Sequence, residues 1–164
     1  MKRIYWMIAL TVLLFACNRK AEKAADYNDN INKLQHRVME KINEVDSTIV
    51  EYDADEMEIA HLELKAEIRR SLQGLRDLGA FTQDSTLFIA SEDLFTFYKE
   101  ISDEEYERLI EIMSLPDSSF TSAEQERASA IFDTIQVRFE TQHEEFKKVQ
   151  QKFIEDYRLT VEED

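Results

Sequence analysis

The chain has 164 residues, of which 35 are acidic and 20 are basic, and its formal net charge at pH 7 is −15. This charge argues against nucleic acid as a partner, because phosphate contacts need clustered Lys and Arg side chains. The length allows one domain with one hydrophobic core. A single cysteine allows no disulfide within the chain.

An export signal is predicted at the start of the chain. Lys2 and Arg3 precede an apolar run from residue 4 to residue 15, and Ala16 and Cys17 follow it. A basic start, an apolar stretch of this length and a small residue before the cleavage site are typical of a secretory signal peptide. The run is too short for a membrane-spanning helix, which needs about 20 apolar residues. We therefore expect residues 1–16 to be removed.

The end of this segment resembles the lipobox of bacterial lipoproteins, which signal peptidase II cleaves, through Leu14, Ala16 and Cys17. The resemblance implies a diacylglycerol on Cys17, cleavage before it and a further acyl chain on the new amino terminus, which together anchor a protein stably. Asn18 after the cysteine resembles the signal for the outer membrane in Gram-negative bacteria. The expected location is the cell envelope, on the periplasmic or the outer face. The alternative is a free Cys17 at the end of an uncleaved signal anchor.

The mature chain is more acidic than the whole, with 18 basic and 35 acidic residues. Residues 17–25 are predicted to be a lipidated tether, in which Arg19, Lys20 and Lys23 can meet phosphate head groups. The acidic body should stand away from an anionic membrane and attract cationic proteins or peptides. The membrane, through the lipid, and a cationic protein or peptide are the expected partners.

Two helices are predicted in the first half of the mature chain. An apolar stripe at steps of three and four residues predicts a helix over residues 24–52, and a second stripe predicts a helix from residue 57 to residue 78. Gly79 stands where a helix C-terminal cap favours glycine. Since the junction between the two stripes is short, the helices should be antiparallel neighbours.

The second half predicts two more helical blocks. Residues 87–113 form the third, and the capping-box spacing of Ser102 and Glu105 predicts a kink or a break near residue 102 with a new helix start. Residues 115–119 read as a loop because of Pro116. Thr121 and Glu124 repeat the capping-box spacing before a last helix that should end near residue 160. Residues 161–164 form an acidic tail.

These blocks predict an all-α fold, an antiparallel up-down-up-down four-helix bundle over residues 26–160. An extended coiled-coil dimer is the alternative architecture, and the oligomeric state stays open. Three short motifs resemble the middle part of uncharacterised helical lipoproteins of Gram-negative bacteria, a group that carries no activity to transfer. They are Gly79-Ala80-Phe81 with Asp84-Ser85, Phe95-Thr96-Phe97-Tyr98, and Glu104-Glu105-Tyr106.

Two Glu-x-x-His pairs, Glu58 with His61 and Glu140 with His143, have the spacing that di-iron bundles use for metal ligands. At about 100° per residue, however, both glutamates point away from the apolar stripes of their helices, and the histidines lie on the flanks. We expect solvated boundary residues here, with no metal and no other cofactor. No serine has a local signature of a nucleophile.

Aromatic residues concentrate in the third block, at Phe88, Phe95, Phe97 and Tyr98. Phe95 and Phe97 lie about 160° apart on a helix, so they cannot share one core stripe. The outward residue either fills a second core layer or lies in an exposed patch that binds a partner. The sequence as a whole predicts a lipid-anchored, non-catalytic binding or structural module. A metal- or small-ligand-binding bundle and a chaperone-like client-binding protein are the alternatives.

Overall fold

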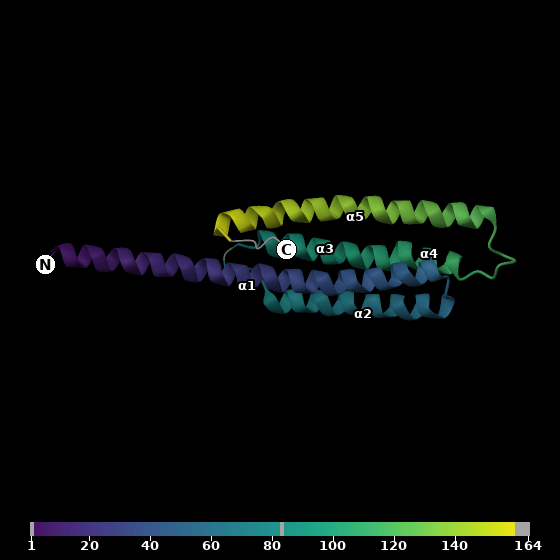
Figure 1. The fold of residues 1–164 in the computed structure, drawn as a ribbon, viewed down its shortest axis with the longest axis horizontal. Helices are drawn as coiled ribbons and strands as arrows, with labels where there is room; N and C mark the ends of the chain where they lie inside the picture. The colour runs from purple at the N-terminus through teal and green to yellow at the C-terminus, as the bar shows by residue number, and fades with distance from the viewer. Residues whose placement is uncertain (1, 83, 160–164) are drawn as a thin grey trace.

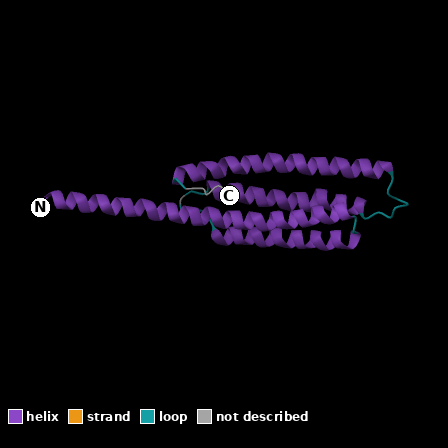
Figure 2. Ribbon diagram, viewed as in Figure 1, coloured by secondary structure: helices purple, strands orange, loops and turns teal. Residues whose placement is uncertain are grey.

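The described part of the chain is a bundle of four long helical segments (Figures 1 and 2). The computed structural model describes residues 2–82 and 84–159, and it describes side chains from Arg19 onward. Within these residues there is no strand, and the one β-type contact is an isolated bridge between Phe81 and Asp84. The helical segments are α1 (Lys2–Glu51), α2 (Ala54–Leu78), α3 (Thr86–Ile101), the π-helical turn η1 (Ser102–Tyr106), α4 (Glu107–Met113) and α5 (Ser122–Tyr157).

The segments run up, down, up and down, with α3, η1 and α4 forming one ascending segment (Figure 1). Helix α2 packs between α1 and α3, and α5 packs against α3 and closes the ring against α1. The apolar stripes of all four segments meet in one core, in which Ile31, Leu64 and Leu94 are almost fully buried. The predicted antiparallel four-helix bundle is confirmed.

Helix α1 begins well before the predicted residue 24 and extends beyond the rest of the bundle (Figure 1). Residues 19–25, predicted as a tether, lie within this helix, and Ala24 has no exposed surface. The core therefore begins at Ala24. Cys17 and the predicted signal peptide lie outside the residues whose side chains are described. No helix among the described residues is long and apolar enough to cross a membrane.

The ends of α2 show why the chain turns there. The side chain of Asp53 accepts a hydrogen bond of 3.1 Å from the backbone amide of Glu56, which satisfies an otherwise free donor at the helix start. Gly79 has φ +67° and its amide donates to the carbonyl of Leu75, so the predicted glycine cap is confirmed. The hydroxyl of Tyr27 donates to the Gly79 carbonyl at 2.8 Å and ties this turn to α1.

The third block is irregular where the sequence predicted it, but for a different reason. Ser102 has helical dihedrals of φ −65° and ψ −42°, and its side chain caps nothing. The chain passes from α3 through η1 into α4 without a break, because Ile101, Tyr106 and Leu109 all remain in the core. The predicted helix start at Ser102 is therefore wrong, and a π turn stands in its place.

The second predicted capping box does begin a helix. The hydroxyl of Thr121 accepts a hydrogen bond from the backbone amide of Glu124 at 3.4 Å, and α5 follows. This helix ends at Tyr157, where Arg158 takes the left-handed conformation with φ 53°. The acidic tail, residues 161–164, lies outside the described residues.

Candidate functional site

The aromatic block of the third segment belongs to the core. Phe95, Phe97 and Tyr98 are buried, and Phe88 is partly buried against the same cluster. Phe97 points toward α5, where its ring centroid lies 5.3 Å from that of Phe139. Of the two alternatives for this block, the structure shows the second core layer. Phe95, Phe97 and Tyr98 therefore offer a partner no exposed patch.

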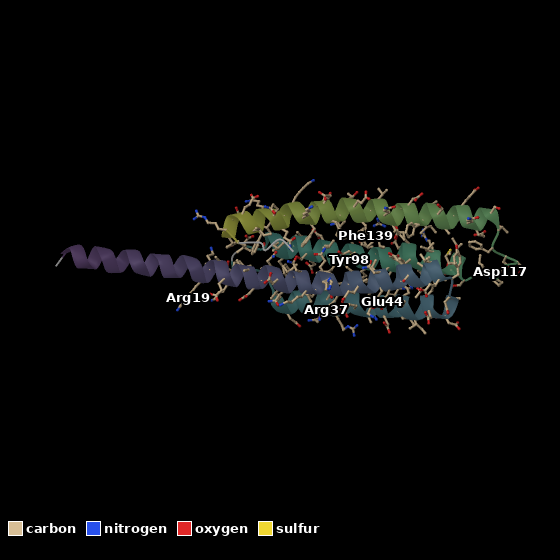
Figure 3. The ribbon with its side chains drawn as sticks, viewed as in Figure 1. Arg19, Arg37, Glu44, Tyr98, Asp117 and Phe139 are labelled. Carbon is tan, nitrogen blue, oxygen red and sulfur yellow. The ribbon has the colours of Figure 1, made fainter. Side chains whose placement is uncertain are left out.

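Tyr98 and His143 form a polar pair inside this aromatic layer (Figure 3 labels Tyr98 and Phe139). The Tyr98 hydroxyl lies 2.6 Å from Nε2 of His143, and Gln35 of α1 donates to the same hydroxyl at 3.5 Å. Burial raises the pKa of Tyr98 and lowers the pKa of His143, because each charged form loses solvent. The pair is therefore neutral near pH 7 and links α3 to α5.

The two predicted Glu-x-x-His pairs do not form a metal cluster. His61 is buried, which corrects the expectation of a solvated residue, and its Nε2 lies 2.7 Å from the Ser102 carbonyl. Glu58 and Glu140 are exposed. Across the described residues, no three His, Cys, Asp or Glu side chains gather closely enough to hold a metal ion. The two histidines instead bind neighbouring helices through hydrogen bonds.

The π turn η1 receives polar side chains from the other three helices of the bundle. His61 of α2 bonds to the Ser102 carbonyl, Arg138 of α5 pairs with Glu105, and Asp46 of α1 accepts a hydrogen bond from Tyr106. A π turn inserts one extra residue, so it rotates the following helix and aims these groups at different neighbours. Neither Asp46 nor Arg138 is predicted from the sequence to belong to such a set.

Asp46 and Tyr106 also line a groove between α1 and α5. The groove has a volume of about 240 Å³, and its walls combine apolar side chains with two amides. The Tyr106 hydroxyl donates to Oδ1 of Asp46 at 2.7 Å. Burial raises the pKa of Asp46, and the hydrogen bond from Tyr106 partly opposes the rise. The lining residues are Met39, Ile42, Asn43, Asp46, Tyr106, Phe132, Ile135, Gln136 and Phe139.

No family model, curated protein or solved structure matches this chain. The site is therefore defined by its own geometry. One signal in the sequence did indicate Asp46: it lies four residues after Ile42 and three before Ile49, on the edge of the apolar stripe. An acid at such a position is drawn toward the core, where its charge must find a donor.

The charge of the bundle is strongly uneven along its length. The half that contains Arg19, here called the anchor half after the anchor predicted from the sequence, comprises residues 19–37, 67–101 and 141–159. The far half comprises residues 38–66 and 102–140 and contains Asp117; Figure 3 labels Arg19 at one end and Asp117 at the other. The ion pair of Arg37 with Glu67 shows that the boundaries of the two halves on α1 and α2 lie at the same height along the bundle axis. The anchor half holds 13 basic and 13 acidic residues, whereas the far half holds 5 basic and 19 acidic residues.

Exposed large apolar side chains are more numerous in the far half than in the anchor half, among the residues whose side chains are described. Of the seven exposed large apolar residues among the described side chains, six belong to the far half and Ile89 belongs to the anchor half. Leu62 is 60% exposed and Phe132, on the rim of the groove, is 45% exposed. The far half thus combines negative charge with apolar surface. The six residues are Val50, Tyr52, Ile59, Leu62, Phe132 and Val137.

Proposed function

We propose that this chain is a lipid-anchored, non-catalytic binding module of the Gram-negative cell envelope that holds a cationic, amphipathic protein segment on its far half. The observation that carries the proposal is the overlap of negative charge and exposed apolar side chains in that half. Negative charge steers a basic partner to the surface, and apolar contacts hold it there. A basic amphipathic segment offers both kinds of group on one helix.

Helix α1 sets the distance between Cys17 and the far half. Cys17 precedes the first core residue, Ala24, by seven positions in the chain, which is about 10 Å along a helix at ~1.5 Å per residue. Helix α1 then continues to Glu51, a further 40 Å or so by the same rise. Lipids on Cys17 would place the neutral anchor half beside an outer-membrane surface and the acidic far half away from it.

The binding proposal is tested with two peptides of 14 residues and the same pattern, one of Lys and Leu and the other of Glu and Leu. The mature chain with Cys17→Ser keeps the protein free of lipid, and fluorescence anisotropy measures binding. We expect the Lys peptide to bind with an affinity that falls as salt rises, and the Glu peptide not to bind. Equal binding of both peptides would contradict the proposal.

The location of the binding surface is tested with matched surface variants. Leu62→Ser in the far half should weaken binding of the Lys peptide, whereas Ile89→Ser in the anchor half should leave it unchanged. Both side chains are exposed, 60% and 52% respectively, so neither change disturbs the core. Equal losses in the two variants would show that the far half is not the binding surface.

The anchor is tested separately by mass spectrometry of the protein extracted from membranes. We expect the mass of a chain that begins at Cys17 and carries acyl groups, and an unlipidated form for Cys17→Ser. A chain that retains Met1 and has no added acyl mass would remove the proposed location in the envelope.

A further inference from the structure

The groove between α1 and α5 offers one carboxylate inside apolar walls. Asp46 is the only charged residue among those that line it, and its other polar residues are Asn43, Tyr106 and Gln136. No lysine, arginine or histidine of the lining neutralises the carboxylate. Asp46 has no ion-pair partner within the described part of the chain, so a positively charged ligand can form an ion pair with it.

The two oxygens of Asp46 are not equivalent. Oδ1 accepts the hydrogen bond from Tyr106 at 2.7 Å, whereas Oδ2 has no hydrogen-bond partner among the described residues. Two other side-chain oxygens, Ser102 Oγ and Glu105 Oε2, also lack a partner and are fully buried, whereas Oδ2 of Asp46 is not fully buried. Oδ2 therefore keeps some solvent-accessible surface, and because Asp46 lines the groove, this oxygen is the free acceptor for a ligand bound there.

The walls favour a long alkyl chain behind the charge. Phe132 and Phe139 from α5 and Met39 from α1 line the groove, and Phe132 is 45% exposed at its rim. Lysine carries four methylene groups that pack on apolar surface while the ammonium stays at the polar end. The aromatic rings also attract a cation that lies over their faces.

The geometry at Asp46 discriminates between the two basic side chains. A guanidinium binds a carboxylate best through two parallel hydrogen bonds, one to each oxygen. Tyr106 already donates to Oδ1, so a guanidinium that binds both oxygens must share Oδ1 with the phenol hydroxyl. An ammonium group can bind Oδ2 alone, because it acts as a compact point charge with rotatable donors.

We infer that the α1–α5 groove is a specific site for one lysine side chain of the partner, with the ammonium at Oδ2 of Asp46 and the alkyl chain against Phe132 and Phe139. The inference rests on the proposed function, because it names the part of a cationic segment that the far half recognises. A bound ammonium would also offset the burial that raises the pKa of the Asp46 carboxyl.

The test uses n-butylammonium as a lysine side-chain probe, with n-butylguanidinium and 1-pentanol for comparison. The methyl signal of Met39, which lines the groove, reports binding by NMR in protein labelled at the methionine methyl groups. We expect saturable shifts with n-butylammonium, weaker binding of n-butylguanidinium and weaker binding still of 1-pentanol. If 1-pentanol bound as well as n-butylammonium, the inference would be wrong.

Two variants separate the carboxylate from general charge. Asp46→Asn keeps an acceptor for Tyr106 and should weaken n-butylammonium binding about tenfold, which corresponds to ~1.4 kcal/mol. Glu44→Gln removes one charge from the same helix at an exposed position that pairs with Lys41, outside the groove. It should leave the binding nearly unchanged, and an equal loss in both variants would overturn the inference.

Tyr106→Phe provides an independent test with the opposite sign. Removal of the hydroxyl frees Oδ1, so n-butylguanidinium should gain affinity relative to n-butylammonium; an unchanged ratio would contradict the role of Tyr106.

The binding experiments with n-butylammonium and the Lys peptide also distinguish this inference from the proposed function. If the Lys peptide binds but n-butylammonium does not, only the lysine site is wrong. If n-butylammonium binds but the Lys peptide does not, the proposed binding of a cationic segment is wrong.

Discussion

The hydroxyl oxygen of Tyr98 lies 2.6 Å from Nε2 of His143, so one hydrogen bond joins α3 to α5 inside an aromatic layer. The contact has little water around it, because Tyr98 is 1% exposed. A buried polar group that loses its partner keeps its desolvation cost, which makes such a bond more important than an exposed one.

Tyr98→Phe removes this hydroxyl and keeps the ring. We expect the free energy of unfolding to fall by about 1 kcal/mol, the usual net value of one hydrogen bond. Urea denaturation monitored by circular dichroism measures the change. Tyr52→Phe is the matched control, because Tyr52 is 66% exposed, and it should have no measurable effect. An equally stable Tyr98→Phe variant would show that the hydrogen bond contributes nothing.

His61 and His143 should make the bundle less stable in mild acid. Burial lowers the pKa of both histidines, and at His61 the Ser102 carbonyl and the nearby Glu107 and Asp103 only partly oppose this effect. The unfolded state therefore binds protons more readily than the folded state below pH ~6.5. The stabilisation is complete above that pH and is lost as the pH falls through the folded-state pKa values.

The measurement is the unfolding free energy at several pH values between 7.5 and about 5, a range above the usual pKa values of the carboxylates. A double variant, His61→Gln with His143→Gln, should lose most of the pH dependence in this range, although it is less stable overall. His36→Gln is the control, since His36 is exposed. A wild-type stability that rises toward pH 5 would contradict the prediction.

Asp46→Asn should be at least as stable as the wild type at pH 7. The folded-state pKa of Asp46 is raised, so ionisation costs more in the folded than in the unfolded chain, and stability falls as pH rises through both values. Asparagine removes this cost and still accepts from Tyr106. Thermal melts at pH 7 and pH 3 measure the effect, and the advantage should shrink at pH 3. A clear loss of stability at pH 7 would contradict the prediction.

The two glycines of the chain should respond differently to alanine. Gly79 has φ +67°, which a side chain strains, so Gly79→Ala should destabilise the bundle by about 1 kcal/mol although no atom lies within 4 Å of the added carbon. At Gly74 the added carbon would lie 3.0 Å from Cδ2 of Leu34, which borders an open groove of about 700 Å³.

Leu34 can therefore move a few tenths of an ångström, and Gly74→Ala should stabilise the bundle by up to ~1 kcal/mol through helix propensity. Urea denaturation of both variants measures these changes. If Gly74→Ala were the more destabilising of the two, the side chain of Leu34 could not move aside for the added carbon, which would contradict the prediction.

Phe97 and Phe132 separate a structural from a binding role. Phe97 is 7% exposed and contacts Phe139, so Phe97→Ala should cost about 3 kcal/mol. Phe132 is 45% exposed, so Phe132→Ala should cost less than about 1 kcal/mol. The same change should weaken binding of the Lys peptide. Unfolding and anisotropy titrations measure the two effects, and a Phe132 variant that binds normally would remove this ring from the binding surface.

The fold was predictable where the periodicity of apolar residues decides it. The stripe from Tyr27 to Ile49 is buried almost in full, because steps of three and four residues put these side chains on one face of a helix. The capping box at Ser102 failed for a related reason. Ile101 and Tyr106 on either side of it are each 1% exposed, and their burial in one continuous helical segment outweighs the ~1 kcal/mol that a serine cap supplies.

The candidate site was predictable only in part. The charge and the aromatic residues are visible in the sequence, but the groove depends on how α5 lies against α1, which no local pattern specifies. His61 shows the same limit. A histidine on the flank of a stripe can face water or a neighbouring helix, and here the π turn brings the Ser102 carbonyl within 2.7 Å of it.

Helix α1 contains neither glycine nor proline, and it joins the neighbourhood of Cys17 to the far end of the bundle without an interruption. A continuous helix without these residues has no hinge, so the tilt and rotation of one end fix those of the other end as well as the distance between them. Under the proposed anchoring, the acidic far half would stay within a narrow range of heights above the membrane surface. A partner held on the same membrane would then meet it with its orientation already restricted, which reduces the entropy lost on docking.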